Sequence, residues 1–143
     1  MKYLTIIFCL FMAANATSQE WGTVKGNKAT FKEVAPIWPG CEGDNVASRD
    51  HCFNQKLATH IASKFRYPAN EYKNNIQGKV TVVFDINTKG MVEVKKVSGG
   101  NKGLQEEAKR IINEIPKMAR PGLLAGKPRA IEYTVPITFK TGK

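Results

Sequence analysis

Two short segments of alternating apolar and polar residues, joined by a turn, restrict the fold more than any other feature of this sequence. Residues 79–86 place apolar side chains at every second position, and residues 91–97 repeat the pattern in a shorter form. Such a period of two is typical of a β-strand with one buried face. The turn between them ends in Gly90, and glycine readily adopts a left-handed backbone. The sequence therefore predicts an antiparallel β-hairpin.

Two amphipathic helices flank the predicted hairpin. The first is expected to begin at a cap formed by Ser48 or Asp50 and to end near Phe65, because apolar residues recur every four positions within it. The second is expected over residues 103–115, where one apolar stripe faces charged residues and Pro116 ends the helix. Residues 118–128, between this helix and the last strand, are rich in glycine and proline and are expected to form a loop.

The last predicted element is a long strand over residues 130–140, again with one apolar face. Pro136 lies within it, and proline cannot donate a hydrogen bond to a β-ladder. This strand is therefore expected at a sheet edge, with the nitrogen of Pro136 facing outward. Together the elements predict an α+β fold with two layers, in which two helices pack against a three-stranded antiparallel sheet.

The N-terminus has the pattern of an export signal. An apolar run over residues 3–14 follows Lys2 and ends in Ala14 and Ala16, a spacing that signal peptidase accepts. The run is too short to span a bilayer, which needs about 20 apolar residues. We therefore expect a cleavable signal peptide over residues 1–16 and a flexible leader over residues 17–35; an uncleaved N-terminal anchor is the alternative.

Two cysteines remain after the predicted signal peptide, Cys41 and Cys52. In an oxidising compartment an even number of cysteines favours a disulfide. A metal site that also used His51 and His60 is the rival hypothesis, but the spacing matches no compact zinc pattern. We expect the disulfide, and no metal, within a turn-and-helix region over residues 36–66.

Charge and composition exclude several classes of function. The chain has 22 Lys and Arg against 12 Asp and Glu, a net charge of +10, but its lysines are scattered and accompany no nucleic-acid recognition motif. No nucleophile, base and orienting group can be assembled. The sequence therefore predicts neither a nucleic-acid-binding protein nor an enzyme, and no cofactor or small-molecule substrate. A binding module is the class that remains, since an edge strand can accept an extended peptide.

Residues 67–143 resemble the C-terminal domain of TonB, the energy transducer of outer-membrane transporters. The resemblance rests on an ordered set of short motifs, each weak alone: Tyr67-Pro68, Gly78-Lys79-Val80, Phe84-Asp85-Ile86, Gly90-Met91-Val92, Val97-Ser98-Gly99, Gly126-Lys127-Pro128 and Val135-Pro136-Ile137-Thr138-Phe139. The chain departs from the family in its predicted cleavable signal peptide and in the absence of a long proline-rich spacer.

The resemblance implies a periplasmic protein that binds an outer-membrane receptor, or another envelope protein, by adding a segment of it as a strand. Carried over to this sequence, the docking edge comprises Glu132, Tyr133, Thr134, Val135, Ile137, Thr138 and Phe139, with Arg66 and Tyr67 near the approach. The alternative is a free-standing scaffold or self-associating module, in which the same edge forms a homodimer.

Overall fold

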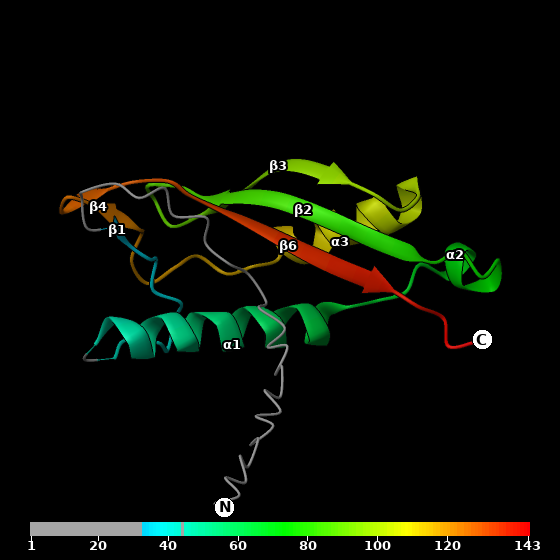
Figure 1. The fold of residues 1–143 in the computed structure, drawn as a ribbon, viewed down its shortest axis with the longest axis horizontal. Coiled ribbons are helices and arrows are strands. Elements are labelled where there is room, and N and C mark those ends of the chain that lie inside the picture. Colours follow the sequence, from blue (N-terminus) through cyan, green and yellow to red (C-terminus); the bar gives the residue numbers. More distant parts are fainter. Residues whose placement is uncertain (1–32, 44) are drawn as a thin grey trace, which may run out of the picture.

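The computed structural model describes residues 33–43 and 45–143. The predicted signal peptide and nearly all of the predicted leader lie outside these residues. Along the described chain the elements follow in the order β1-α1-α2-β2-β3-α3-β4-β5-β6, an α+β arrangement (Figure 1). Its three main strands form one antiparallel sheet, and a second, much smaller sheet lies at one end. The predicted fold class is confirmed.

The main sheet contains the predicted hairpin and the last strand, in the spatial order β3-β2-β6. Strand β2 (Gly78–Ile86) pairs with β3 (Val92–Ser98) on one side and with β6 (Ile131–Phe139) on the other, antiparallel in both cases. In the hairpin turn, the side-chain oxygen of Asn87 accepts hydrogen bonds from the backbone N–H groups of Lys89 and Met91, each at 2.9 Å. Gly90 has the expected left-handed backbone, with φ of +79°.

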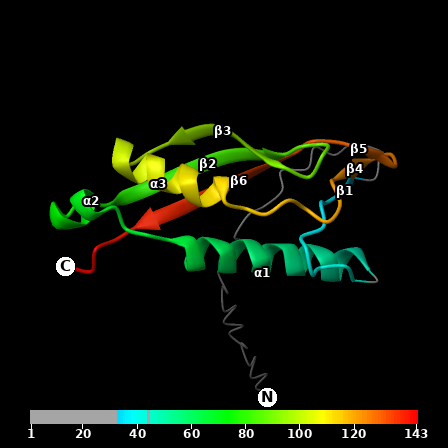
Figure 2. The same cartoon turned by 180° about the vertical axis from the view of Figure 1, so that it is seen from behind.

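Helices α1 (Val46–Lys64) and α3 (Lys102–Asn113) lie on the same side of this sheet (Figure 2). Helix α3 packs against β2 and β3, whereas α1 lies along β6. The predicted cap of α1 is wrong: the N-cap is Asn45, whose side chain accepts a hydrogen bond from the backbone N–H of Ser48 at 2.8 Å. Asparagine is as good an N-cap as serine or aspartate, so the helix begins one turn earlier than the apolar stripe indicated.

The second sheet was not predicted. It joins three two-residue strands, β1 (Glu33–Val34), β4 (Leu123–Leu124) and β5 (Lys127–Pro128), within segments expected to be leader and loop. Strands this short carry no alternating pattern. The turn between β4 and β5 uses Ala125 and Gly126, both at positive φ, and alanine is not the residue that normally marks such a turn. The five-residue helix α2 (Ala69–Lys73), whose N-cap is Pro68, was also not predicted.

One hydrophobic core includes the upstream helix as well as the sheet. The ring of Phe53 on α1 stacks on Tyr133 of β6 at a centroid distance of 5.0 Å, and Phe65 packs on Phe139 at 5.1 Å. These aromatic side chains fill the space between α1 and β6. The remaining buried apolar side chains of β2 and α3 are Val80, Val82, Phe84, Ile86, Leu104, Ala108, Ile111 and Ile112.

Candidate functional site

Strand β6 is an edge strand, as predicted. Its nine residues pair with β2 from Gly78↔Phe139 to Ile86↔Ile131 without a register shift. Within residues 33–43 and 45–143, no strand pairs with the other side of β6. The backbone N–H and C=O groups on that side have no strand partner among the described residues and can pair with a further strand.

The predicted docking residues fall into two sets with different surroundings. One set has buried side chains that belong to the core: Tyr133, Val135, Ile137 and Phe139, none more than 5% exposed. The side chains of the other set, Glu132, Thr134 and Thr138, are exposed on the opposite face. A partner strand can therefore contact the side chains of the second set, whereas the side chains of the first set lie in the core behind the strand.

Pro136 indicates which backbone groups point outward. It pairs with Thr81 in an unbroken ladder, and a proline nitrogen within a ladder belongs on the unpaired side because it has no hydrogen to donate. Backbone groups of alternate residues along a strand share one direction. Thr134 and Thr138 therefore direct N–H and C=O groups toward the open edge, while Pro136 contributes only its carbonyl.

A groove of about 600 Å³ runs beside this edge, between the C-terminal part of α1 and β6. Most of its lining is apolar, and its one charged lining residue is Lys140. From α1 the groove is lined by Ile61, Ala62 and Phe65; from β6 and just beyond by Pro136, Ile137, Thr138 and Lys140. Ile61 and Phe65 belong to the apolar stripe of period four that predicted this helix, and the structure leaves both only partly buried. Nothing in that stripe distinguishes them from its buried members.

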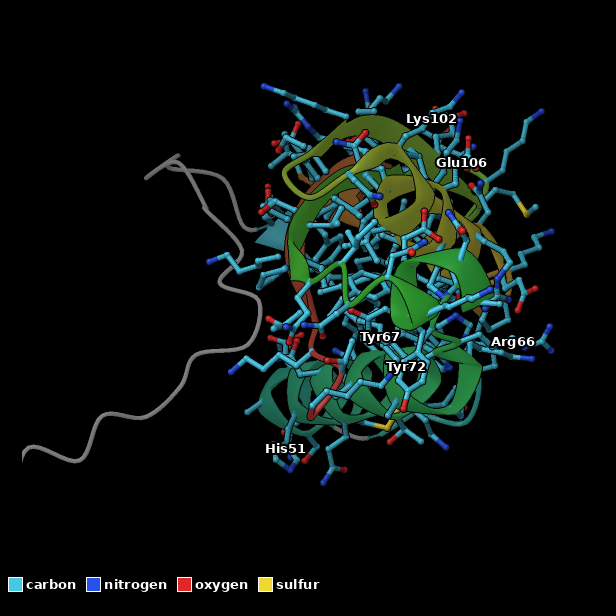
Figure 3. The ribbon with its side chains drawn as sticks, turned by 90° about the vertical axis from the view of Figure 1, so that its right-hand side faces the viewer. His51, Arg66, Tyr67, Tyr72, Lys102 and Glu106 are labelled. Carbon is cyan, nitrogen blue, oxygen red and sulfur yellow. A yellow bond between two sulfur atoms is a disulfide. The ribbon has the colours of Figure 1, made fainter. Side chains whose placement is uncertain are left out.

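The two predicted approach residues differ in position. The ring of Tyr67 packs edge-on against Phe139 at 5.7 Å, and its hydroxyl donates a hydrogen bond to the backbone carbonyl of Ile76 at 2.6 Å. Loss of solvation, and then the negative charge of Glu71, raise the pKa of Tyr67. The side chain of Arg66 is exposed and extends on the side of the molecule away from β6 (Figure 3). Only Tyr67 therefore adjoins the end of the docking edge.

The sheet has a second edge, at β3, but this edge is less suited to strand addition. Its partner strand β2 carries a register shift between Val83 and Phe84 opposite β3. The exposed Lys95 of β3 pairs with Glu93 at 3.3 Å and with Asp85 at 3.6 Å, and Glu93 also accepts a hydrogen bond from the side chain of Asn87. That bond, and then Lys95, lower the pKa of Glu93. Charged side chains and irregular pairing are devices that blunt an edge.

The hydroxyl of Tyr133 is buried without a hydrogen-bond partner among the described residues. Burial, and then the negative charges of Asp50 and Glu33, raise the pKa of this phenol. Replacing Tyr133 by phenylalanine should increase the free energy of unfolding by about 1 kcal/mol, because it removes an unsatisfied polar group and keeps the aromatic ring. Urea denaturation measures this change.

Tyr67→Phe is the matched control for that substitution. It also removes one phenolic hydroxyl, but this hydroxyl donates to the carbonyl of Ile76, so the free energy of unfolding should decrease by about 1 kcal/mol. If both substitutions changed stability in the same direction, the contrast between the two hydroxyls would be wrong.

The predicted disulfide between Cys41 and Cys52 is present, and it joins the turn after Trp38 to the N-terminal part of α1. Trp38 packs edge-on against Phe53 at 5.6 Å. The two histidines have different surroundings. His51 is exposed (Figure 3), whereas His60 is buried and its Nε2–H donates a hydrogen bond to the carbonyl of Ile111 at 2.8 Å. In the part of the chain that the structure describes, no cluster of His, Cys, Asp and Glu could hold a metal ion.

The described helices also include none that is long and apolar enough to cross a membrane.

Comparison with known proteins identifies the family of this fold. The model of the family described as Gram-negative bacterial TonB protein C-terminal matches residues 63–141, more than half of the chain. Two solution structures of the TonB C-terminal domain of Helicobacter pylori are similar to it. The longer is 29% identical, covers 62% of this chain and 79% of its own, and has a TM-score of 0.43; the shorter is 26% identical, covers 64% and 96%, and has a TM-score of 0.38. No curated protein matches the chain.

Proposed function

Since this chain belongs to the family of Gram-negative bacterial TonB protein C-terminal domains, which serves energy transduction in the cell envelope, we propose that it binds an extended segment of an outer-membrane receptor. In this proposal the segment adds to the open edge of β6 as a fourth strand of the main sheet. The protein acts in the periplasm as a binding domain and catalyses no reaction.

The observation that carries this proposal is the free edge of β6. This strand is nine residues long, its register with β2 is unbroken, and the side facing away from β2 pairs with no other strand of the described residues. An extended peptide can satisfy such backbone groups with main-chain hydrogen bonds, while its alternate side chains give specificity. The core behind β6 holds the strand rigid, because Tyr133, Val135, Ile137 and Phe139 are all buried.

The docked segment would form its hydrogen bonds in two groups. Glu132 and Thr134 lie on one side of the missing donor at Pro136 and Thr138 lies on the other, and each offers an outward N–H and C=O. A receptor segment would therefore be held at two points of the edge. Pulling along the strand direction would load these bonds together, which suits a domain that transmits force to a receptor.

A titration with receptor segments tests the proposal. The ¹⁵N-labelled chain from Thr17 to Lys143 is mixed with synthetic peptides that cover the periplasmic N-terminal segments of outer-membrane receptors. We expect amide shifts concentrated at Glu132, Thr134 and Thr138. Shifts along β3 instead, or none with any receptor segment, would contradict the proposal.

The alternative, a scaffold or homodimer formed through the same edge, has one observation in its favour and one against. The free β6 edge can pair with a second copy as readily as with a peptide. However, each chain carries a formal net charge of +10, so two copies repel one another. Light scattering across a range of protein concentrations separates the two hypotheses, because a strict monomer excludes the homodimer.

A further inference from the structure

The groove beside β6 has a wall that the open strand edge does not need for backbone pairing. Ile61, Ala62 and Phe65 form this wall on α1, at the flank of the stripe that packs into the core. Ile61 and Ala62 precede the segment matched by the family model, which begins at residue 63. The wall therefore comes largely from the upstream helix of this chain.

The pairing of neighbouring β-strands determines which side chain of a docked segment would face the wall formed by α1. Directly paired residues of neighbouring strands point to the same face of a sheet. Ile137 points to the inner face, toward α1, and lines the groove. The residue of a docked segment that pairs with Ile137 would therefore point into the same groove.

We propose that the docked segment carries an apolar side chain at the position paired with Ile137, and that its burial between α1 and β6 selects the segment and fixes its register. This inference rests on the proposed strand addition at β6. Backbone hydrogen bonds do not distinguish one sequence from another, and a shift by one residue moves every side chain to the other face. The groove supplies the discrimination that the backbone cannot.

Charge favours a peptide over a second copy of this chain as the occupant of the groove, which adjoins the open backbone edge of β6. Its one charged lining residue is Lys140, and the chain is strongly basic, so an electrically neutral or acidic segment is attracted whereas another basic chain is repelled.

Three synthetic nonapeptides test the inference. Each has glutamate at both ends, threonine at the six inner flanking positions, and leucine, alanine or asparagine at the centre. Threonine favours an extended backbone, so the three peptides differ only in the central side chain. Binding to the chain from Thr17 to Lys143 is measured by NMR titration of backbone amides and of the Ile methyl groups.

We expect the leucine peptide to bind about tenfold more tightly than the alanine peptide, since a partly buried leucine removes more apolar area from water. The asparagine peptide, similar in size to leucine but polar, should bind no better than the alanine peptide. The methyl signals of Ile61 and Ile137 should shift with the leucine peptide alone.

Ala62→Glu and Ser63→Glu are the matched pair of variants. Both add one negative charge to exposed, adjacent positions of α1, but only Ala62 lines the groove. Ala62→Glu should reduce the leucine-to-alanine affinity ratio to about one, and Ser63→Glu should keep the ratio of the unchanged protein. Circular dichroism confirms that both variants are folded.

The outcomes separate failure of this inference from failure of strand addition. Equal affinity of all three peptides, with shifts at Thr134 and Thr138, would show that the groove does not select the central side chain, although the segment still docks on β6. No shift at these amides with any peptide, receptor segments included, would overturn both. Shifts of Ile61 that depend on protein concentration without peptide would assign the groove to a second copy.

Discussion

Replacing Thr134 and Thr138 together by proline should abolish binding of an extended segment at β6 while the fold remains intact. Each threonine directs its N–H toward the open edge, so proline removes one donor and places a ring where the incoming strand must lie. Leaving one carbonyl of the docked segment unpaired costs about 1–3 kcal/mol, which weakens binding by about 10- to 100-fold for each substitution. NMR titration or calorimetry with a segment that binds the unchanged protein measures this loss.

Pro136→Thr is the matched control, since it supplies the donor that the edge lacks between these two positions. We expect about tenfold tighter binding of the same segment, from one additional main-chain hydrogen bond. This variant should also self-associate more readily, because an interior proline protects an edge strand from pairing with other copies.

Two results would contradict this reading of the edge. Unchanged affinity in the Thr134→Pro, Thr138→Pro variant would show that the segment does not dock on β6. Unfolding of the same variant would show that the N–H groups of Thr134 and Thr138 bond to β2. The backbone groups that face the open edge would then be those of the residues in between, Tyr133, Val135 and Ile137.

The parts of the fold that the sequence predicted are those with long periodic patterns. The hairpin, the last strand and the second helix have apolar stripes that run over most of each element, and the structure places their ends within about two residues of expectation. Pro136 further placed the last strand at an edge, because a single missing donor restricts where a strand can lie. Sequence periodicity thus determined the main sheet and its helices.

The elements that were missed are too short to have a period. Strands β1, β4 and β5 have two residues each, and they are held by pairing with one another rather than by a buried face of their own. A segment of this length is specified by tertiary contacts, such as the hydrogen bond from the N–H of Ile37 to the carbonyl of Arg120 at 3.0 Å.

The candidate site was predicted in part, for a related reason. A β-strand pattern identifies an edge but not what lies beside it, so Glu132, Thr134 and Thr138 were predicted and the groove wall was not. The wall depends on how α1 packs against β6 through Phe53 and Phe65. Arg66 was placed near the edge together with Tyr67 by the family resemblance, but adjacent residues in an extended segment point in opposite directions.

Removing the disulfide by the double substitution Cys41→Ser, Cys52→Ser should lower the free energy of unfolding by about 3 kcal/mol. The crosslink closes a loop between residues separated by 11 positions, and its absence gives the unfolded chain back the corresponding conformational freedom. Urea denaturation without reductant measures the change. The unchanged protein with reductant should unfold at the same urea concentration as the double variant, whereas equal stability of the oxidised protein and the variant would contradict the expected role of the bond.

The disulfide between Cys41 and Cys52 should affect peptide binding as well as stability, because it holds the helix that forms one wall of the groove. It fixes the N-terminal part of α1, and Phe53, one residue after Cys52, stacks on Tyr133 of β6. The same helix carries Ile61 and Ala62 about two to three turns later. A weaker attachment of α1 should therefore reduce the leucine preference at the groove before it reduces backbone pairing at β6, since α1 forms one wall of the groove whereas the β6 backbone is also held by its ladder with β2. The affinities of the leucine and alanine peptides are measured for the double variant at a temperature where it is folded. A lower leucine-to-alanine affinity ratio than in the unchanged protein is expected, and an unchanged ratio would contradict the expectation.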